Sequence, residues 1–460
     1  MITFEGYEDI IEKVYDHRQD HVLAFWETLD DAGRRELLDD LSEVDFGGLE
    51  ALYRQARAET PAARDYAPAD YIPLPEGDAI PAVFTEARRE GAERIKSGKA
   101  AAFVVAGGQG TRLGYDGPKG IFPVGAVSNK SLFQIHAEKV LRACRKYCVA
   151  IPWLVMTSRA NHQATVDFLE EKLFFGLDRD DVIVFPQNMI PSLDLQGRLI
   201  LEGPSRLFRN PDGHGGSLTA LRSSGALEKL SRRGIDTISY FQVDNPLVKI
   251  IDPVFIGFHF IKKAHVSSKG LLKAYPGEKL GMFVRFDDGT TGVVEYSDMP
   301  AALQEKTDPD GRLTFRMGSI AIHLFDVDFI ASITGETGVT LPYHVARKKI
   351  QSYSGDGAKE IEGYKFEKFV FDALPLTEKN VILETRREEE FAPVKNRDGV
   401  DSVDTSRRLM SELYQRWLRD RGITVPDMVE TVEISPLLAD EAEDLASDIT
   451  VPARERVYLE

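Results

Sequence analysis

A short apolar run that leads directly into a glycine-rich segment constrains the fold of this chain more than any other feature. Residues 101–106 (AAFVVA) are apolar without alternation, which is typical of a strand buried on both faces of a sheet. The next segment, Gly107–Gly114 (GGQGTRLG), holds four glycines in eight residues. Glycine lets a backbone approach a ligand closely and turn several N–H groups toward one anion. The sequence therefore predicts an anion-binding loop at the end of a buried strand.

Two cations beside this loop favour a phosphate ligand. Arg112 lies within the loop, and Lys119 follows it in the segment 118–120 (PKG). A Walker-type phosphate loop ends in Gly-Lys-Ser or Gly-Lys-Thr, whereas Lys119 is followed by Gly120, so that type is excluded. Glycine-rich turns also occur for purely structural reasons, and the neighbouring positive charges weaken that alternative here.

A dinucleotide-binding loop is a second alternative, and it would make the chain an NAD-dependent oxidoreductase. Its fingerprint is G-x-G-x-x-G, but Gly108, Gly110 and Gly114 are spaced G-x-G-x-x-x-G. The acidic residue expected about 20 positions further on is missing, because residues 128–130 read Ser-Asn-Lys. Both observations disfavour this class of enzyme.

The central region alternates between short apolar runs and helical patterns. The runs lie at 153–156, 182–185 and 238–243, and the helical patterns at 133–147 and 161–173. This alternation predicts an α/β fold with a doubly wound, Rossmann-like mixed sheet. Short strands and turns replace the pattern from about residue 270 to 325, which indicates a β-rich antiparallel insertion.

Three regions are expected along the chain. They are an N-terminal helical region with a proline-rich strap (1–98), a central catalytic domain (99–385) and a small C-terminal domain (386–460). Apolar residues at three- and four-residue spacing predict helices around 22–29 and 37–44. Five prolines between Pro61 and Pro81 predict a strap over the surface without regular structure.

The composition narrows the classes of function. The chain has 57 Lys and Arg against 74 Asp and Glu, which gives a net charge of −17. Such a balance is not typical of proteins that bind nucleic acid or anionic membranes, although a pocket for a small anion needs only a few cations. Two cysteines in 460 residues cannot form a disulfide framework. The acidic N-terminus and the lack of a long apolar run fit neither a signal peptide nor a membrane helix, so we expect a cytoplasmic protein.

Several sequence blocks together resemble the UDP-sugar pyrophosphorylases, the UDPGP family. GGQGTRLG and PKG match its signature, and four further blocks occur in the same order: 211–216 (PDGHGG), 243–249 (VDNPLVK), 294–297 (VEYS) and 367–372 (EKFVFD). The similarity extends from residues 25–26 (FW) to 433–437 (EISPL) and is strongest to the UDP-N-acetylglucosamine branch. The resemblance implies the fold of the nucleotide-diphospho-sugar transferases.

The resemblance implies a uridylyltransferase that makes a UDP-N-acetylhexosamine, first of all UDP-N-acetylglucosamine, and pyrophosphate from UTP and a sugar 1-phosphate. Direct in-line attack by an ionised phosphate needs neither a general base nor a covalent intermediate. It needs cations around the phosphates and a carboxylate for Mg²⁺, with Mn²⁺ as an alternative. Asp244, directly after the run 238–243, matches the family's metal ligand. From its residues alone, Asp244-Asn245-Pro246 is more typical of a turn.

The resemblance also implies roles for individual positions. The cations expected to act in catalysis are Arg112, Lys119 and Lys395. Positions that match UTP contacts are Val105, Ala106, Gly107, Gly108, Lys119, Gln187, Gly213 and Lys365. Positions that match sugar contacts are His214, Gly281, Glu295, Tyr296 and Ser319, with Lys395 near the sugar phosphate. The amide of Gln187 can satisfy both donors and acceptors of uracil.

Two positions depart from the family pattern. His214 and Ser319 stand where the family usually has asparagine, and both match positions near the sugar. A hydroxyl has a shorter reach than an amide and a different set of hydrogen bonds, so one such change can redirect sugar specificity. Glucose 1-phosphate, galactose 1-phosphate, N-acetylgalactosamine 1-phosphate or a broad range therefore stay open as substrates. A non-catalytic nucleotide-sugar-binding protein is the alternative from another class, and the retained cations and Asp244 disfavour it.

Overall fold

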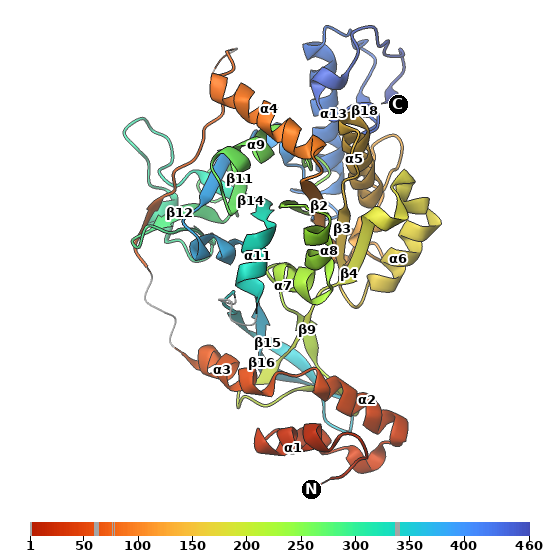
Figure 1. Ribbon diagram of the computed structural model, residues 1–460, viewed down its shortest axis with the longest axis vertical. Helices are drawn as coiled ribbons and strands as arrows, with labels where there is room; N and C mark the ends of the chain where they lie inside the picture. The colour runs from red at the N-terminus through yellow and green to blue at the C-terminus, as the bar shows by residue number, and fades with distance from the viewer. Residues whose placement is uncertain (1, 59–63, 76, 78, 336–340) are drawn as a thin grey trace. The chain divides into compact units, whose positions relative to one another are not determined.

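The chain forms two compact units, each assembled from segments that lie far apart in the sequence. Figure 1 shows a computed structural model that describes residues 2–58, 64–75, 77, 79–335 and 341–460. The first unit comprises Met1–Ala63, Asn188–Gly216 and Leu341–Phe369, and the second comprises Arg64–Gln187, Ser217–Thr340 and Val370–Glu460. The division at residues 98 and 385 stays a prediction.

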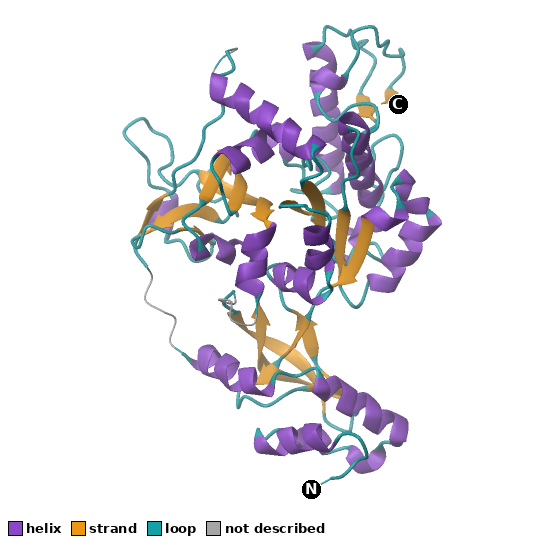
Figure 2. Ribbon diagram, in the orientation of Figure 1, coloured by secondary structure: helices purple, strands orange, loops and turns teal. Residues whose placement is uncertain are grey.

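A ten-stranded sheet lies at the centre of the second unit (Figure 2). Its parallel part has the order β10-β2-β3-β4, with β10 (Thr237–Gln242), β2 (Ala100–Val105), β3 (Trp153–Thr157) and β4 (Val182–Pro186). All residues of β2 are buried. A strand covered on both faces has no polar side, which explains why it is a continuous apolar run in the sequence.

The other part of the sheet is mostly antiparallel and begins with β14 (Met317–Asp326), which pairs antiparallel with β10. The remaining strands are β1 (Tyr66–Pro68), β11 (Val266–Leu272), β12 (Met282–Phe286), β13 (Thr291–Val294) and β17 (Asn380–Glu384). β11 and β12 pair antiparallel with β14, and β12 pairs antiparallel with β13, so antiparallel strands continue the main sheet in the segment where the sequence predicts an insertion.

Helices cover the faces of this sheet. They are α4 (Ala82–Lys96), α5 (Leu132–Tyr147), α6 (His162–Glu171), α7 (Gly216–Ser223), α8 (Ala226–Arg232), α9 (Pro253–Ile261) and α11 (Val327–Thr334), and the short helix α10 (Ala301–Gln304) lies in the connection between β13 and β14. α4 and α9 lie side by side in Figure 1 and cross at two glycines. A Cβ on Gly91 would lie 1.8 Å from the carbonyl oxygen of Pro253, and one on Gly257 would lie 1.7 Å from that of Ala87. The close crossing therefore requires glycine on both helices.

The C-terminal segment shares the core of the sheet. It contains α12 (Arg387–Glu390), α13 (Val403–Asp420), β18 (Thr431–Ile434) and β19 (Arg456–Leu459). Ser402 caps α13 by accepting a hydrogen bond from the backbone of Thr405, which in turn bonds back with its side chain. Buried residues of α13 such as Leu413 and Leu418 belong to the same apolar cluster as Val104 of β2.

The first unit combines helices with small sheets. Its helices are α1 (Glu8–Asp16), α2 (Asp31–Ser42) and α3 (Phe46–Arg57), and its strands are β15 (His344–Tyr353), β16 (Ala358–Glu367), β6 (Leu193–Asp194), β5 (Met189–Pro191), β9 (Arg209–Pro211), β7 (Leu201–Gly203) and β8 (Arg206–Leu207). Asp30 caps α2, and Asp45 caps α3, each by accepting a hydrogen bond from a backbone N–H of the first turn. Leu37, Leu193 and Phe366 meet in one buried core.

Two local predictions are wrong. Residues 22–29 form two short 3-10 turns, Asp20–Leu23 and Trp26–Thr28, and not an α-helix. The turns still bury Val22 and Trp26, so the apolar spacing reflects burial and not helix length. The strap is not wholly irregular, because β1 adds an edge strand to β12, and an edge tolerates proline. Residues 61–63, 76 and 78 of the predicted strap lie outside the described residues.

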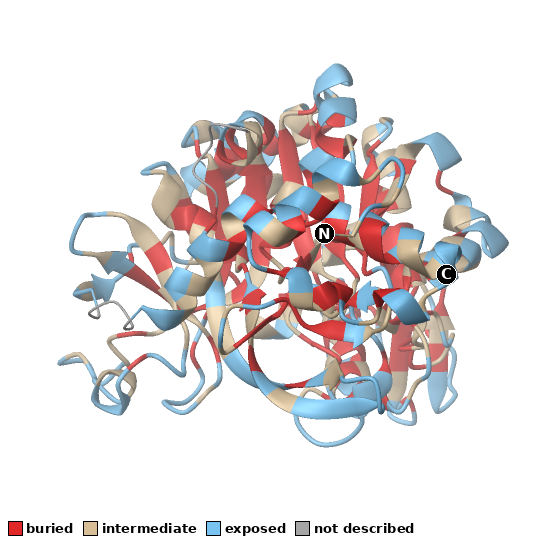
Figure 3. Ribbon diagram, turned by 90° about the horizontal axis from the view of Figure 1, so that it is seen from below, coloured by how far each residue is buried: buried red, intermediate tan, exposed pale blue. Residues whose placement is uncertain are grey.

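Burial is concentrated in the strands of the sheet, as Figure 3 shows, while exposed residues lie on outer faces of helices and on loops. The predicted mixed α/β sheet with covering helices is confirmed. Among the described helices, none is both long and apolar enough to span a membrane.

Candidate active site

Three predicted site segments meet at one edge of the parallel sheet. β2, β10 and β4 run in the same direction, so their carboxyl ends share that edge. Gly107 follows the end of β2, Asp244 that of β10, and Gln187 that of β4. Val105 and Gln242 are direct partners on neighbouring strands. Ligands of open α/β sheets bind outside this edge, which makes it the candidate site.

The glycine loop is fixed by hydrogen bonds near its base. The N–H of Lys119 donates to the carbonyl of Gly108 at 3.0 Å, which folds the chain back on itself. The side-chain amide of Asn161 donates to the carbonyls of Ala106 and Gly108 at 3.0 and 3.3 Å. Asn161 is buried and directly precedes α6. The position of α6 therefore helps to fix where the glycine loop begins after β2.

Gly107 and Gly108 differ in what surrounds them. A Cβ on Gly107 would lie 3.3 Å from both the Gln187 side-chain oxygen and the backbone nitrogen of Ser158, so the Gln187 side chain packs against this glycine. A Cβ on Gly108 would meet no heavy atom within 4 Å, and the residue is exposed. Gly108 is therefore open to a ligand, whereas Gly107 allows Gln187 to approach.

Lys119 and Asp244 form an ion pair across the loop. The ammonium of Lys119 lies 3.2 Å from Asp244 Oδ2, and the two side chains are 15% and 20% exposed. A cation and a carboxylate thus lie together, mostly covered but still accessible, where the glycine loop meets the end of β10. Partial burial strengthens their electrostatic effect relative to a pair in open water.

The segment that carries Lys395 is attached to the end of β10. The N–H of Val394 donates to the carbonyl of Asp244 at 2.8 Å. The next side chain, Lys395, extends its ammonium to 3.4 Å from Asp401 Oδ2 and is 45% exposed. This ammonium is therefore held near the site edge but remains open to solvent.

Arg112 lies in the short 3-10 turn Thr111–Leu113 and is exposed. Its carbonyl accepts a hydrogen bond from the N–H of Arg397 at 3.2 Å, which links the glycine loop to the segment that follows Lys395. The structure therefore gathers the three predicted catalytic cations and Asp244 at one edge of the second unit.

The predicted sugar-contacting residues of the second unit also lie together. The N–H of Ser319 donates to the carbonyl of Gly281 at 2.8 Å, and a Cβ on Gly281 would lie 3.2 Å from a carboxylate oxygen of Glu295. Tyr296 follows and is 38% exposed. β14 is antiparallel to β10, so Ser319, near the start of β14, lies toward the edge where β10 ends.

Three predicted site residues, Gly213, His214 and Lys365, belong to the first unit. Gly213 has a φ of +82°, and a Cβ there would lie 2.4 Å from the carbonyl oxygen of Lys368, so only glycine fits. Lys365 lies on β16 with its ammonium 5.1 Å from the centre of the Phe208 ring.

The His214 ring stacks on Phe369, with ring centres 5.3 Å apart and planes 16° apart. Burial, with a smaller effect of His344, lowers the pKa of His214 to about 4. Its imidazole is therefore neutral near pH 7, where one ring nitrogen donates a hydrogen bond and the other accepts one.

The sequence matches one protein family over most of its length. The family model, described as UTP–glucose-1-phosphate uridylyltransferase (UDPGP), matches residues 54–436. This chain belongs to the UDPGP family. The blocks that carry the predicted site residues lie within the matched range.

Relatives of this UDPGP chain include proteins named for one sugar. UDP-N-acetylglucosamine diphosphorylase 2 of Arabidopsis thaliana is 35% identical, over 96% of this chain and 92% of its own length. UDP-N-acetylglucosamine pyrophosphorylase of Saccharomyces cerevisiae is 38% identical, over 78% of this chain and 77% of its own. The crystal structure of the uridine diphosphate N-acetylglucosamine pyrophosphorylase of Trypanosoma brucei with an inhibitor superimposes with a TM-score of 0.83 at 27% identity, over 100% of this chain and 99% of that one.

The donor atoms at this edge of the sheet fit magnesium better than they fit a metal whose ligands all come from the protein. Among residues 2–58, 64–75, 77, 79–335 and 341–460, no three His, Cys, Asp or Glu side chains gather as a metal site. Zinc sites need three or four such ligands, whereas magnesium takes one or two carboxylates and completes its shell with phosphate and water. The partly exposed Asp244 fits the second pattern.

Sequence reasoning assigned no role to Asn161 or Asn245. Asn161 has no motif around it, and only the structure shows its contact with the glycine loop. Asn245 lies inside a recognised block, directly after Asp244, and is buried. Its position directly after a predicted metal ligand was the feature of the sequence that could have indicated a role.

Proposed function

We propose that this UDPGP chain is a UDP-N-acetylglucosamine pyrophosphorylase. It transfers the uridylyl group of UTP to N-acetylglucosamine 1-phosphate and releases pyrophosphate. The contact of Lys119 with Asp244, beside the open Gly108, carries the proposal, because it joins a cation, a carboxylate and a loop accessible to ligand. Relatives with this activity in their names, similar over nearly the whole chain, support it.

The reaction needs alignment and charge neutralisation more than acid–base chemistry. An oxygen of the sugar phosphate forms a bond to the α-phosphorus of UTP, and the bond from that phosphorus to the oxygen bridging to the β-phosphate breaks. The displaced pyrophosphate leaves on the opposite side. Because the sugar phosphate attacks the α-phosphorus directly, no covalent enzyme intermediate forms. The attacking phosphate is already ionised near pH 7, so the protein need not remove a proton. Its task is to hold two anions in line and offset their charge.

The proposed UTP contacts come from the loop and the neighbouring strand ends. The backbone of residues 105–108 faces the ribose and phosphates, and the amide of Gln187 hydrogen-bonds to uracil. Lys119 contacts the phosphates, as does Lys365 in the first unit, where Gly213 is the second proposed uracil contact. The exposure of Gly108 supports this assignment, since a side chain there would occupy the ligand's space.

Asp244 is the proposed ligand for Mg²⁺, with Mn²⁺ as an alternative. When bound, the cation offsets charge on the phosphates of UTP. Lys119 orients the Asp244 carboxylate through the contact at 3.2 Å. Arg112 and Lys395 supply fixed positive charge toward the phosphates of UTP and of the sugar, respectively.

Sugar recognition is assigned to Gly281, Glu295, Tyr296 and Ser319, with His214 in the first unit. The Glu295 carboxylate accepts hydrogen bonds from sugar hydroxyls. A neutral His214 offers one donor and one acceptor, as the asparagine amide of the family does at that position. Ser319 has a shorter reach than asparagine, and this difference favours testing glucose 1-phosphate as a second substrate.

Both proposed substrates are small molecules, so the proposal requires neither nucleic acid nor a membrane as a partner. The two cysteines, Cys144 and Cys148, are free, which supports a reducing, cytoplasmic setting. The catalytic assignments lie mainly within the predicted central domain, residues 99–385, and Lys395 lies just beyond it.

Pyrophosphate release tests the proposed function. The purified chain is incubated with UTP, Mg²⁺ and each of four sugar 1-phosphates: N-acetylglucosamine, N-acetylgalactosamine, glucose and galactose. We expect release with N-acetylglucosamine 1-phosphate at the highest kcat/KM and none after chelation of the divalent cation. Binding of UTP without turnover of any sugar phosphate would instead identify a nucleotide-sugar-binding protein.

A further inference from the structure

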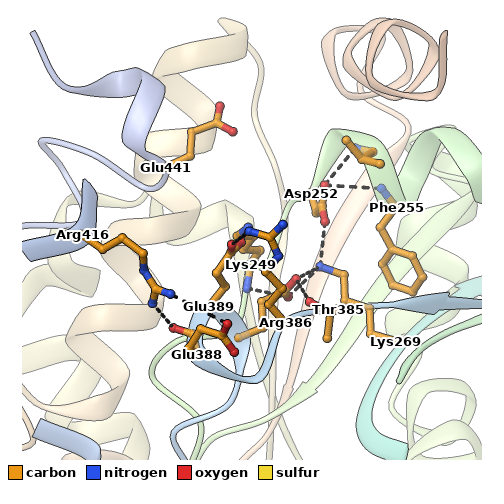
Figure 4. Close-up of polar contacts among 12 residues, drawn as sticks. Lys249, Asp252, Phe255, Lys269, Thr385, Arg386, Glu388, Glu389, Arg416 and Glu441 are labelled. Carbon is orange, nitrogen blue, oxygen red and sulfur yellow. Dashed lines mark hydrogen bonds and ion pairs between the residues drawn. The ribbon is translucent and has the colours of Figure 1, made fainter. Parts of the chain in front are cut away.

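A buried cluster of charges lies outside the proposed contacts with substrate. Lys269 of β11 is 1% exposed, and its ammonium donates to both carboxylate oxygens of Glu390 at 2.6 Å and to Asp252 at 2.7 Å. Figure 4 shows the Lys269 ammonium directed at Asp252, at the start of α9. Burial alone would raise the pKa of Asp252, but Lys269 and Lys249 hold it at about 2. Asp252 is therefore ionised at neutral pH.

The Glu390 carboxylate is held by several hydrogen bonds. Its side chain is 3% exposed, and besides Lys269 it accepts hydrogen bonds from the hydroxyl of Thr385 at 2.7 Å and the N–H of Lys249 at 3.4 Å. A buried carboxylate with this many donors has one well-defined position. The cluster borders a cavity of about 440 Å³ that Lys249, Lys269 and Glu390 help to line. No part of the glycine loop lines that cavity.

The backbone of the same glutamate holds the end of β10. The Glu390 carbonyl accepts a hydrogen bond from the Asn245 side-chain amide at 2.7 Å, and Asn245 Oδ1 accepts one from the N–H of Ala392 at 3.1 Å. Two residues further on, the N–H of Val394 donates to the Asp244 carbonyl. Residues 390–394 are thus bound along residues 244–245, and Lys395 follows immediately.

We propose that Glu390 is a positioning residue for the transfer reaction: anchored by Lys269 and bonded to Asn245, it sets the distance between Asp244 and Lys395. The inference rests on the proposed function of those two residues. Glu390 binds neither of their side chains, so it acts only through the backbone segment that joins them. The metal-binding carboxylate and the sugar-phosphate cation come from segments about 150 residues apart, and misplacement by about 1 Å can cost up to about a hundredfold in rate.

Steady-state kinetics of Glu390→Gln test this role. The substitution keeps the volume of the side chain but removes the charge that fixes it to Lys269, while Asp252 still pairs with Lys269. We expect kcat to fall about tenfold to a hundredfold, as for residues that orient metal ligands, and the Mg²⁺ concentration for half-maximal rate to rise about tenfold. The KM for UTP should stay within about twofold, since the nucleotide contacts are elsewhere.

Glu389→Gln is the matched control. Glu389 is the preceding residue, and it also pairs with a lysine, Lys249, at 2.8 Å. No hydrogen bond connects it to Asn245 among the residues that the structure describes. This variant should keep kcat and the Mg²⁺ requirement within about twofold of the unmodified chain.

The outcomes separate a positioning role from a merely structural one. If Glu390→Gln has the kcat and Mg²⁺ requirement of Glu389→Gln, whatever its thermal stability, the proposal is overturned. Should Glu390→Gln fail to fold, Asn245→Ala answers the same question, because it breaks the bond to the Glu390 carbonyl and leaves the Lys269 pair intact. A raised Mg²⁺ requirement there supports the proposal, and unchanged values overturn it. Inactivity of the unmodified chain with every sugar phosphate would instead refute the proposed function.

Discussion

The ammonium of Lys119 lies 3.2 Å from Oδ2 of Asp244, although the two residues are 125 positions apart in the sequence. Lys119 follows the glycine loop after β2, and Asp244 follows the end of β10. The parallel pairing of these strands brings the two side chains to one edge of the sheet. The pair links the loop proposed to bind UTP with the carboxylate proposed to hold the cation.

Removing either member of this pair should abolish most turnover without unfolding the chain. We expect Lys119→Met and Asp244→Asn each to lower kcat at least about a hundredfold, since each removes charge aimed at the reacting phosphates. Pyrophosphate release and thermal unfolding are the two measurements. Lys262→Met, an exposed lysine after α9, is the control and should keep full activity. Near-normal kcat in Asp244→Asn at all Mg²⁺ concentrations would remove Asp244 from the mechanism.

A methyl group on Gly108 should weaken UTP binding while the fold stays intact. A Cβ there meets no protein atom within 4 Å, so Gly108→Ala adds volume only to the space proposed for the nucleotide. We expect the KM for UTP to rise about tenfold, with thermal stability unchanged. Gly203→Ala is the control, because its Cβ also meets nothing within 4 Å and it lies on the β7 strand. Equal KM values in the two variants would place the nucleotide elsewhere.

The part of the site that local patterns encode was predictable from the sequence. The apolar run before Gly107 predicts a strand buried on both faces, and the glycines that follow predict a backbone that approaches a ligand closely. Asp244 follows a second run of the same kind. Because parallel neighbours end at one edge, these two patterns place the loop and the carboxylate together.

The supporting contacts could not be predicted, because no local pattern encodes them. Lys269 and Glu390 are 121 positions apart, and charged residues in a sequence are by default expected at the surface. Their burial follows only from the pairing of β11 with β17, which precedes α12 and Glu390. The apolar spacing also could not distinguish the 3-10 turn at Asp20–Leu23 from an α-helix, because both show the same spacing over a few residues.

Asparagine at position 319 should shift the choice of sugar. Ser319 is half-buried, and its N–H is bonded to the Gly281 carbonyl, so the substitution leaves that backbone contact in place and changes only the side chain. We expect Ser319→Asn to raise the ratio of kcat/KM for N-acetylglucosamine 1-phosphate over glucose 1-phosphate about tenfold, about 1.4 kcal/mol, through one added hydrogen bond. Ser231→Asn, on the exposed end of α8, should leave the ratio unchanged. If both variants give the same ratio, residue 319 does not contribute to selectivity.

Acid should destabilise the chain through His136, which lies beneath the end of β10. Its ring nitrogen Nε2 donates to the Val243 carbonyl at 2.9 Å, and burial lowers its pKa from 6.5 to about 3. Between pH 6.5 and 3 the unfolded chain binds this proton and the folded chain does not, so the free energy of unfolding falls as pH falls, by up to about 1.4 kcal/mol per pH unit. Urea unfolding at pH 7, 6, 5 and 4 should show a shallower pH dependence in His136→Gln than in the control His17→Gln, where the histidine is exposed. The interpretation fails if the two variants lose stability equally over this range.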